Sequence, residues 1–336
     1  MPGVIDPAAL FAPLDVYPRL GLAVSGGADS LALMLLAAQF AQTPEARHRF
    51  VVYSVDHALR PEAADEVRFV LAEAGRLGFA ARGLRWAGAK PASGLQEAAR
   101  HARYSLMGAA MRADGVPVLL TAHHLGDQAE TVLMRLAHGS GVEGLRGMDD
   151  HVEIDGVHLV RPLLGIDPAH LRRLVDDAGL VPVADPSNAD PDYERVRWRQ
   201  ALPMLATLGL DANRLGRFAA RMRDADAALA HAADQAIAEL GESGVGAPMA
   251  RAWLMDLPRA VAVRVVGRAL AQIGGGQKPH ALGAIERLTE RIGREPFKTT
   301  LHGCVITSDG TRVTIAKEAG RAAAAAGRDP ADHDRV

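Results

Sequence analysis

The sequence predicts an α/β fold, in which a doubly wound, mostly parallel sheet is followed by a smaller, mostly helical domain with a C-terminal β-hairpin. Two observations support this prediction. Up to about residue 205, short apolar runs rich in β-branched residues alternate with segments of helical length, which is typical of βαβ units. Beyond that point long helical segments follow one another, and the last β-rich stretch contains an Asp-Gly turn.

Four apolar runs are the candidate strands of the sheet. They cover residues 20–24, 51–55, 79–86 and 116–120. The helical segments that follow them cover residues 30–40, 61–77, 95–113 and 126–138. Because strands connected by helices of this length run parallel, their carboxyl ends meet at one edge of the sheet, which is where such folds bind ligands. We therefore expect a catalytic domain over residues 1–205 with its site at that edge.

The second domain is expected over residues 206–318. Long helices are predicted at residues 211–240, 258–273 and 279–293. The stretch TTLHGCVITSDGTRVTIAKE then predicts two strands joined at Asp309-Gly310. Residues 319–336 contain little that could pack against a core and are expected to form a disordered tail.

Composition excludes several classes of protein. The formal net charge is −2, so the whole chain is not a basic nucleic-acid-binding protein. No run of about 18 uncharged apolar residues occurs, and the N-terminal segment carries Asp6 and Asp15, unlike a signal peptide. The single cysteine, Cys304, cannot form a disulfide or a multi-cysteine metal site within this chain. We expect a cytoplasmic protein with no membrane association and no implied protein partner.

A glycine-rich loop follows the first predicted strand. Tandem glycines between a strand and a helix let backbone N–H groups converge on an anion. The loop lacks both the Gly-Lys-Ser/Thr ending of a P-loop and the G-x-G-x-x-G of dinucleotide sites. A carboxylate beside phosphates requires a bridging cation such as Mg²⁺, and Asp29 is its candidate ligand; a plain tight turn is the alternative. The candidate phosphate-binding residues are Ser25, Gly26, Gly27, Ala28, Asp29 and Ser30.

A second polar group lies in TAHHLGDQAETVLMRLAHGSGVEGLRGM. Residues His123, Asp127 and Glu130 are spaced i, i+4, i+7, which predicts one face of a helix. Two like charges three residues apart cost a few tenths of a kcal/mol. The pair therefore either lies on a solvated face or faces a cation, which could be a metal or an ammonium group.

Two groups of arginines are candidates for contacts with phosphate. Developing negative charge on a reacting phosphate requires a positioned arginine, and Arg100 and Arg103 in EAARHARY are both available. An ordinary exposed helix surface is the alternative for both. Seven arginines and one acid occur between Arg195 and Arg223. This basic stripe indicates either a phosphate-contacting surface or a solvated charged face.

The glycine loop resembles the SGGxDS signature of the N-type ATP pyrophosphatases, which reads SGGADS here. The resemblance implies that the loop holds pyrophosphate while ATP is cleaved between its α and β phosphates. It also implies that AMP is transferred to a carbonyl oxygen, with ATP and Mg²⁺ as cofactors.

Six further motifs resemble the tRNA(Ile)-lysidine synthase family and keep its order over roughly residues 18–200. They are VDHALRP, LQEAARHARY, HHLGDQAET, GSGVEGLRGM, RPLL and DPSNADPDYERVRWR. The resemblance implies that free L-lysine is ligated to the 2-carbonyl carbon of the wobble cytidine in a CAU-anticodon tRNA(Ile). The reaction would pass through an adenylated cytidine, release pyrophosphate and AMP, and give lysidine.

The same resemblance implies roles for individual residues. Asp127 and Glu130 would bind the cationic lysine, His123 would lie near the cytosine or the phosphate, and Arg103 rather than Arg100 would face the α-phosphate. The implied catalytic residues are Asp29, Arg103, His123, Asp127, Glu130 and Arg195. The expected tRNA contacts are Arg199 together with Arg214, Arg217 and Arg221, of which the last three share one helix face.

Three positions depart from the family pattern. Val196 replaces an asparagine, His138 replaces an arginine that could contact phosphate, and Ala63 stands where a serine is common after LRP.

Three alternative functions remain. The alternatives are another ATP pyrophosphatase acting on tRNA, such as a thiolase, a glutamine-dependent amidotransferase, and a non-catalytic ATP-binding module. A single cysteine disfavours a thiolase, and no glutaminase half is visible. A binding module would need neither paired acids nor a basic segment.

Overall fold

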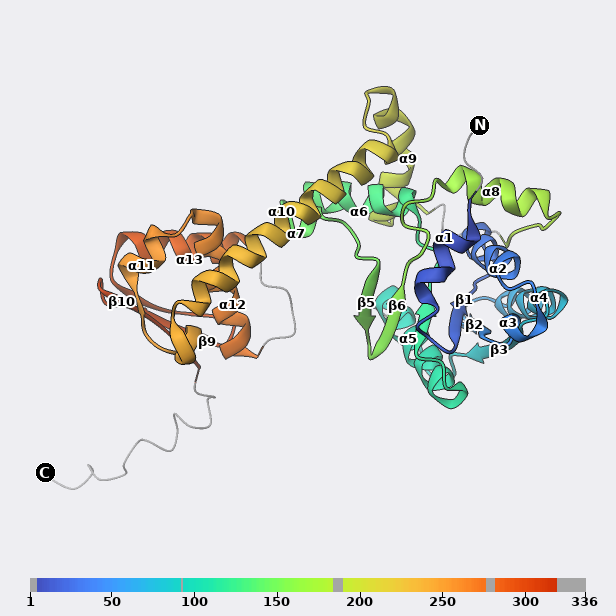
Figure 1. Cartoon of the computed structure of the whole chain (residues 1–336), viewed down its shortest axis with the longest axis horizontal. Coiled ribbons are helices and arrows are strands. Elements are labelled where there is room, and N and C mark those ends of the chain that lie inside the picture. Colours follow the sequence, from blue (N-terminus) through green and yellow to red (C-terminus); the bar gives the residue numbers. More distant parts are fainter. Residues whose placement is uncertain (1–4, 92, 184–189, 276–281, 319–336) are drawn as a thin grey trace, which may run out of the picture. The chain divides into compact units, whose positions relative to one another are not determined.

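The chain divides into two compact units in the computed structural model, which describes residues 5–91, 93–183, 190–275 and 282–318 (Figure 1). The first unit comprises the residues up to Gly139 and those from Gly144 to Arg221. The second comprises Ser140–Glu143 and the residues from Met222 onward. The expected tail at residues 319–336 lies outside the described residues.

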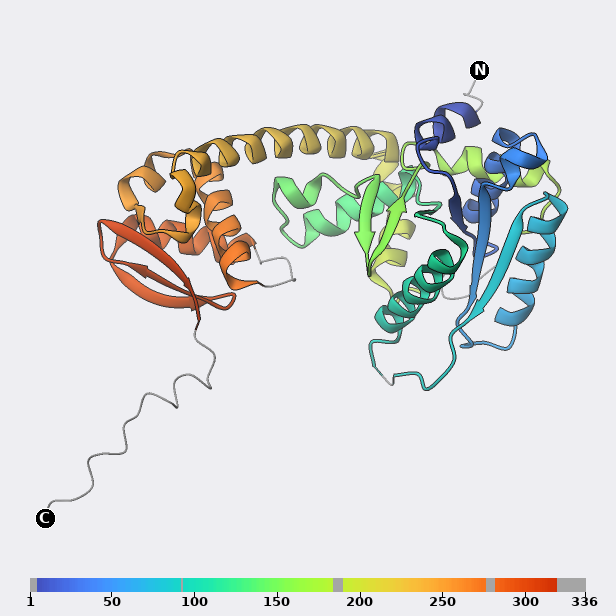
Figure 2. The ribbon, with the colours of Figure 1, turned by 60° about the horizontal axis from the view of Figure 1, so that its bottom comes forward.

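The first unit is built on a six-stranded sheet with the order β3-β2-β1-β4-β6-β5 (Figure 2). Its strands are β1 (Leu20–Ala23), β2 (Phe50–Asp56), β3 (Ala80–Arg85), β4 (Val118–Leu120), β5 (His151–Ile154) and β6 (Val157–Val160). All neighbours pair in parallel except β5, which runs antiparallel to β6 at the edge. The predicted mostly parallel sheet is confirmed.

The β5–β6 hairpin was not predicted from the sequence, although its turn is determined by local residues. Asp155 and Gly156 have φ values of 52° and 72°, so both central residues of the two-residue turn are left-handed. That geometry matches the twist of a hairpin and favours Asp-Gly. The two strands are only four residues long each, which leaves too few positions for a clear alternating pattern.

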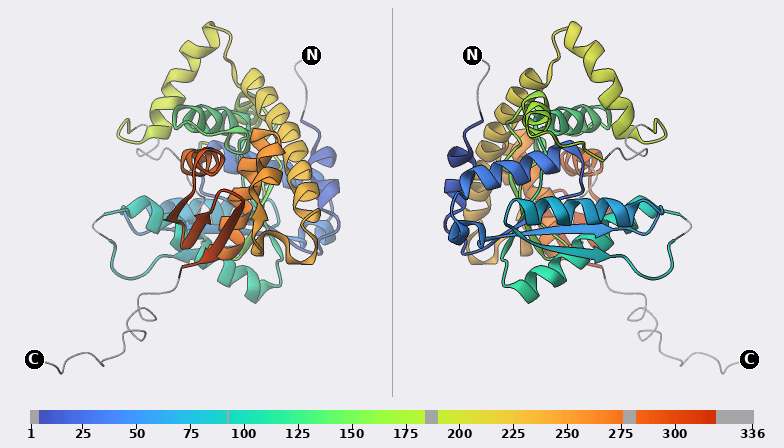
Figure 3. Two further views of the ribbon diagram at one scale, coloured as in Figure 1. Left: turned by 90° about the vertical axis from the view of Figure 1, so that its left-hand side faces the viewer. Right: turned by 90° about the vertical axis from the view of Figure 1, so that its right-hand side faces the viewer.

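Helices cover both faces of the sheet, as a doubly wound fold requires. The helices of this unit are α1 (Pro7–Phe11), α2 (Ala28–Phe40), α3 (Pro44–Arg47), α4 (Ala63–Arg76), α5 (Leu95–Asp114), α6 (Leu125–Ala137), α8 (Pro168–Asp177) and α9 (Glu194–Thr207), with the short α7 (Val142–Leu145) at its border. Val52 of β2 lies in the core formed with α2, α4 and α8, whereas Val51 and Tyr53 lie in the core formed with α5. Figure 3 shows α2 and α4 running along the strands.

A third apolar cluster joins α6 to α9 and to the start of α10 (Ala212–Ala238). Ala129 and Val132 of α6 pack with Leu215 and Ala219 of α10, and Trp198 of α9 packs against them. The first part of α10 therefore belongs to the first unit, and the division falls within this helix. The expected limit of the catalytic domain at residue 205 stays a prediction.

The second unit combines helices with a four-stranded antiparallel sheet of order β7-β10-β9-β8. Its strands are β7 (Met249–Ala250), β8 (Phe297–Leu301), β9 (Cys304–Ser308) and β10 (Arg312–Lys317). Besides the rest of α10, its helices are the short 3₁₀ segment Gly241–Gly246, α11 (Arg251–Asp256), α12 (Arg259–Gly274) and α13 (Leu282–Arg294). The predicted helices over 211–240 and 258–273 are confirmed, and the start of the one predicted at 279 lies outside the described residues.

The predicted C-terminal hairpin is present but is part of a larger sheet. The β9–β10 pair turns at Asp309-Gly310 as expected. The segment expected to be one strand before it is two, β8 and β9, because His302 and Gly303 form a turn with φ values of 51° and 71°. Among the described residues, no helix has both the length and the apolar character needed to cross a membrane.

Candidate active site

The glycine loop (residues 25–30) connects the carboxyl end of β1 to α2. Gly26 has a φ of 88°, and a Cβ there would lie 2.9 Å from Cγ2 of Val183, so only glycine fits. Ser30 Oγ donates to the carbonyl of Gly27 at 2.9 Å, and the N–H of Ser25 lies 3.2 Å from Ser30 Oγ. Ser30 therefore closes the loop, and the first turn of α2 directs its N–H groups toward the carboxyl edge of the sheet.

Asp29 lies in the first turn of α2, and its side chain is 47% exposed. Among the described residues no group of three or more His, Cys, Asp or Glu side chains could hold a metal ion. Mg²⁺ commonly binds through one or two carboxylates and completes its shell with water and substrate phosphates. Asp29 therefore fits a Mg²⁺ shared with a nucleotide, whereas a metal cage made by the protein does not fit.

His124 connects the glycine loop to the second motif, and sequence analysis did not single it out. Its Nε2 lies 3.4 Å from Oδ2 of Asp29 and 3.6 Å from Oδ2 of Asp127. Its Nδ1 accepts a hydrogen bond from the N–H of Gly126 at 3.0 Å, so in the neutral ring the proton is on Nε2, facing the carboxylates. His124 is the N-cap of α6, and its own N–H donates to Asp127 at 2.9 Å.

The expected polar stripe on α6 is therefore partly wrong. The helix begins at Leu125, so His123 precedes it and does not share a face with Asp127 and Glu130. The signal available in the sequence was Asp127 alone, an acid at the third position of the helix, because histidine is not among the usual capping residues.

Burial and neighbouring charges act in opposite directions on His124. Burial lowers its pKa, but the hydrogen bond with Asp29 and the charges of Asp29, Asp127 and Glu130 raise it, and the net shift is upward. The pKa of Asp127 is shifted in the complementary direction. Burial raises the pKa of Asp127. The charges of His124 and Arg195 and the hydrogen bond from the backbone N–H of His124 lower it by more, so the net shift is downward and the carboxylate stays ionised.

Two arginines of α9 neutralise the acid pair (Asp127 and Glu130). Glu130 is 1% exposed and accepts hydrogen bonds from Nε of Arg195 and Nε of Arg199, both at 2.7 Å. Nη2 of Arg195 also donates to Oδ1 of Asp127 at 2.9 Å. The acids are buried, which excludes the solvated-face alternative, and the cations that they face here are guanidinium groups of the same chain.

Two of the departures from the family pattern, Val196 and His138, lie at or near α9. Val196 is buried within α9, and His138 Nε2 lies 3.0 Å from Oε1 of Glu194 at the start of that helix. His138 can therefore hold the N-terminal end of α9 near the end of α6.

His123 lies beside the acid pair in the segment between β4 and α6. Its Nδ1 lies 2.9 Å from Oγ1 of Thr121. Burial lowers its pKa to about 4, and Arg161, Arg195 and Arg100 act in the same direction, against the opposing effect of Asp127. The imidazole is therefore neutral at pH 7.

Replacing His123 with asparagine is expected to change the pH dependence of stability. The wild-type histidine has a pKa near 6.5 when unfolded and about 4 when folded, so the unfolded state binds more protons between these values. The free energy of unfolding should fall by on the order of 2 kcal/mol more in the wild type than in His123→Asn between pH 7 and pH 5. Urea unfolding of both proteins at the two pH values measures this, and parallel pH profiles would contradict the burial of His123.

The remaining predicted arginines lie at different places in the first unit. Arg103 is exposed, and its Nε lies 3.3 Å from Nε2 of His57, just after β2. Arg100 lies over the ring of Tyr104. These positions on α5 do not test which of the two faces the α-phosphate, so the choice of Arg103 stays a prediction.

The predicted tRNA contacts separate into two groups. Arg199 is held by Glu130 as described above, whereas Arg217 and Arg221 are exposed on α10. Arg214 is exposed as well and donates to the carbonyl of Gly209 at 2.7 Å. The opposite face of α10 packs on α6, so the three α10 arginines point away from that core.

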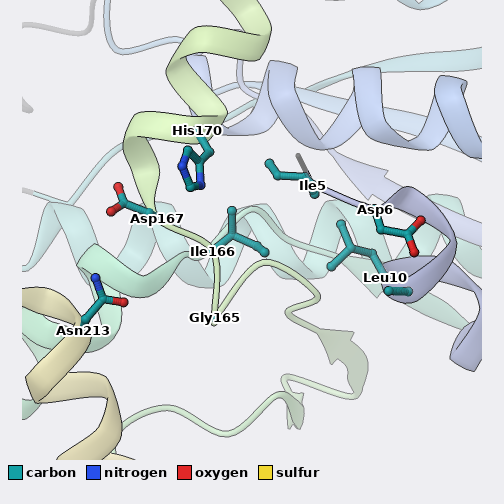
Figure 4. A pocket seen from close by; sticks show the side chains of 9 residues that line it. Ile5, Asp6, Leu10, Gly165, Ile166, Asp167, His170 and Asn213 are labelled. Carbon is teal, nitrogen blue, oxygen red and sulfur yellow. The ribbon is translucent and has the colours of Figure 1, made fainter. Parts of the chain in front are cut away.

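A separate cavity of about 370 Å³ lies between α1, α8 and the start of α10 (Figure 4). It is lined by Ile5, Asp6, Ala9, Leu10, Gly165, Ile166, Asp167, His170 and Asn213. Its two acids, Asp6 and Asp167, each accept a hydrogen bond from the first turn of their own helix. None of the predicted site residues lines it, and we assign it no part in the reaction.

Comparison with known proteins adds two kinds of similarity. The sequence profile of PP-loop domains matches residues 7–205. A tRNA(Ile)-lysidine synthase of Rhodopseudomonas palustris is 44% identical over 322 residues, which cover 91% of this chain and 92% of the relative. Another tRNA(Ile)-lysidine synthase, from Methylobacterium nodulans, is 44% identical over 314 residues, covering 90% and 91%.

Among solved structures, the U34-tRNA thiolase NcsA of Methanococcus maripaludis with its 4Fe–4S cluster aligns with a TM-score of 0.53. The alignment covers 64% of this chain and 77% of the thiolase at 16% identity, which is similarity of fold alone.

Proposed function

We infer that this chain, which belongs to the PP-loop family and within it to the tRNA(Ile)-lysidine synthases, is an ATP-dependent ligase that makes lysidine. Its substrates are L-lysine and the wobble cytidine of the CAU anticodon of tRNA(Ile). One observation carries the assignment of the site. His124 lies within 3.6 Å of both Asp29 of the glycine loop and Asp127 of the acid pair, so the ATP motif and the second motif form one site.

The first step uses the glycine loop. The O2 atom of cytidine attacks the α-phosphorus of ATP, an O–P bond forms, and the bond between the α- and β-phosphates breaks. The pyrophosphate that leaves carries negative charge, which the N–H groups of residues 25–30 and the N-terminal end of α2 stabilise. A Mg²⁺ ion held by Asp29 would neutralise phosphate charge in this step.

The second step uses the acid pair. An amine of lysine attacks C2 of the adenylated cytidine, a C–N bond forms, the C–O bond to AMP breaks, and the amine loses a proton. Two neighbouring carboxylates raise the pKa of a bound amine, so that amine stays protonated and is not a nucleophile. We accordingly assign Asp127 and Glu130 to the lysine ammonium group that does not react, which leaves the other amine free to attack.

Lysine binding at this place requires an exchange of cations. Glu130 is 1% exposed and its oxygens already accept from Arg195 and Arg199, so an ammonium group has to replace one of them. Arg195 is the better candidate to leave because it makes the closer contact with Asp127, the more accessible acid: Oδ1 of Asp127 lies 2.9 Å from Nη2 of Arg195 and 3.6 Å from Nη2 of Arg199. Once released, Arg195 would be free to stabilise negative charge on the α-phosphate.

The exposed arginines of α10 are proposed to bind the tRNA backbone. Arg217→Ala is expected to weaken tRNA binding, because an arginine–phosphate contact is lost, and the effect should be larger at low salt. The slope of log Kd against log salt should become smaller by about 0.9. Arg172→Ala on α8, an exposed arginine paired with Asp176, is the matched control. If log Kd depends on log salt with the same slope in Arg217→Ala and Arg172→Ala, Arg217 does not contact tRNA.

The runner-up function, tRNA thiolation, receives no support from the chain's cysteine. The single cysteine, Cys304, is buried in β9, where burial raises the pKa of its thiol and Sγ faces the carbonyl of Leu270 at 3.7 Å. A thiol in that environment is a poor nucleophile. A location in the cytoplasm stays a prediction that follows from the tRNA substrate.

The decisive experiment measures pyrophosphate release from ATP together with incorporation of labelled lysine into transcripts of CAU tRNA(Ile) and tRNA(Met). We expect lysine-dependent labelling of the first and not of the second. Pyrophosphate release without lysine incorporation would support ATP chemistry with another nucleophile. Absence of both would contradict the proposed function.

A further inference from the structure

Arg161 is a buried cation that the reaction as described does not use. It directly follows β6 and opens the RPLL segment, and it is 6% exposed. Its Nη1 donates to the backbone carbonyl of Asp149. Its Nε has no hydrogen-bond partner within the part of the chain that the structure describes.

The charge of Arg161 is not neutralised by a contacting carboxylate among the described residues. Asp149, the carboxylate whose charge acts on Arg161, uses its side chain to bind Nη2 of Arg146 at 3.0 Å. Burial lowers the pKa of Arg161, and the charges of Arg100 and Arg135 act in the same direction; Tyr104 and Asp149 act in the opposite direction, but the net shift is downward. A buried guanidinium without a counter-charge is unfavourable, so its retention here requires an anionic ligand to be compensated.

The position of Arg161 indicates which anion this is. The end of β6 lies beside the end of β4, where the N–H of Thr121 donates to the carbonyl of Val160 at 3.0 Å. The next strand is β1, which leads into the glycine loop. Adjacent strands are about 4.8 Å apart, so the end of β6, which Arg161 follows, lies about 10 Å from the end of β1, which leads into the glycine loop. The charge of Arg161 also acts on His123, whose pKa it lowers.

We propose that Arg161 binds a phosphate oxyanion of the reacting complex, either the α-phosphoryl group of ATP or the phosphodiester next to the wobble cytidine. This rests on the proposed function, because that function brings both groups to this edge of the sheet. The planar guanidinium can donate two parallel hydrogen bonds to such an oxyanion through Nε and Nη2, because among the described residues only Nη1 donates to the protein.

The test compares Arg161→Gln with a matched control, Arg135→Gln. Arg135 is another arginine of this unit that bonds only backbone carbonyls, those of Gly144 and Gly147 at 2.8 Å and 2.6 Å. In one arm, the affinities for ATP and for adenosine are measured without tRNA. In the other arm, the affinity for the tRNA(Ile) transcript is measured without ATP over a range of salt concentrations.

An α-phosphoryl contact predicts that Arg161→Gln binds ATP about 10- to 100-fold more weakly and adenosine with unchanged affinity. A phosphodiester contact predicts weaker tRNA binding and a salt slope that is smaller by about 0.7. Either result supports the proposal and names the source of the phosphate. If Arg161→Gln does not fold, Arg161→Lys replaces it in the test. Lysine keeps the charge and loses only the planar guanidinium, so this variant should bind the phosphate-bearing ligand, ATP or tRNA, about fivefold more weakly than the wild type.

Changes no larger than those of Arg135→Gln in both arms would overturn the proposal and leave Arg161 with a structural role. Lysine incorporation by the wild type is measured in parallel. If the wild type incorporates no lysine, the proposed function is wrong. If the wild type incorporates lysine and Arg161→Gln binds ATP and tRNA as the wild type does, only the inference about Arg161 is wrong.

Discussion

Replacing Glu130 with glutamine is expected to reduce lysine incorporation by at least about 100-fold, while pyrophosphate release is retained. Glu130 is 1% exposed and accepts three hydrogen bonds from Arg195 and Arg199. Glutamine has a similar shape but carries no charge, and its NH₂ group would face a guanidinium donor. The proposed lysine site therefore loses one of its two carboxylates and most of its attraction for an ammonium group.

The same substitution is expected to destabilise the first unit. Breaking a buried ion pair by removing one partner costs about 3–5 kcal/mol, because the other charge is left uncompensated. The partners here are 39% and 46% exposed, so water can hydrate them, and we expect a value near the lower end, about 3 kcal/mol. Urea unfolding of both proteins measures this loss.

Lysine affinity separates the catalytic role of Glu130 from a structural one. Equilibrium binding of labelled lysine to folded Glu130→Gln, in the presence of ATP and tRNA, should be weakened about 100-fold. Arg172→Gln, which breaks an exposed pair with Asp176, is the control and should change neither lysine binding nor stability by much. Unchanged lysine affinity in Glu130→Gln would limit the acid pair to anchoring α9.

The glycine loop could be predicted from sequence because its structure is determined within a few residues. Ser30 bonds Gly27, and the positive φ of Gly26 can be adopted by glycine without strain. The parallel strands were predictable for a similar reason, because each is a short apolar run between helices. The two missed turns, at Asp155-Gly156 and His302-Gly303, lie between strands too short to show an alternating pattern.

The pairing of Glu130 with Arg195 could not be predicted from sequence spacing. The two residues are 65 positions apart, and they meet because apolar faces of α6 and α9 pack together. Glu130 stands out in the sequence by its spacing from Asp127 and Arg195 by its place in the basic stripe, but the family resemblance implied that the acids bind lysine. His124 was missed because a histidine before a helix is an unusual cap, and the position next to it matched the expected spacing.

Replacing Asp29 with asparagine is expected to reduce pyrophosphate release by about 100- to 1,000-fold and to leave tRNA affinity within about twofold. Asp29 is the carboxylate of the glycine loop, and it is the residue that fits a Mg²⁺ shared with the nucleotide. Asparagine keeps the size and one oxygen but removes the charge. The α-phosphate would then be attacked with less of its negative charge neutralised, whereas the α10 arginines that are proposed to bind tRNA are unaffected.

His124 supplies a second readout of Asp29 that does not depend on activity. Because Asp29 raises the pKa of His124 through a hydrogen bond and through its charge, Asp29→Asn should lower the pKa of that histidine. Asp177→Asn at the end of α8 is a suitable control, because Asp177 is exposed and is not among the groups named as shifting the pKa of His124. NMR titration of the histidines measures the shift, and a pKa of His124 equal in wild type and Asp29→Asn would contradict the bridge between the two motifs.

Pyrophosphate release and the pKa of His124 together show what the contact of His124 with Asp29 and Asp127 does. A folded-state pKa above 6.5 means that His124 contributes stability below about pH 6.5, and that this contribution is lost as the pH rises through the folded pKa. A Mg²⁺ ion bound at Asp29 offsets the charge that raises the pKa of His124, so saturating Mg²⁺ without ATP should lower that pKa in the wild type and have no such effect in Asp29→Asn. If Mg²⁺ shifts the pKa equally in both proteins, the metal binds elsewhere, and Asp29 acts by orienting His124 rather than by holding the ion.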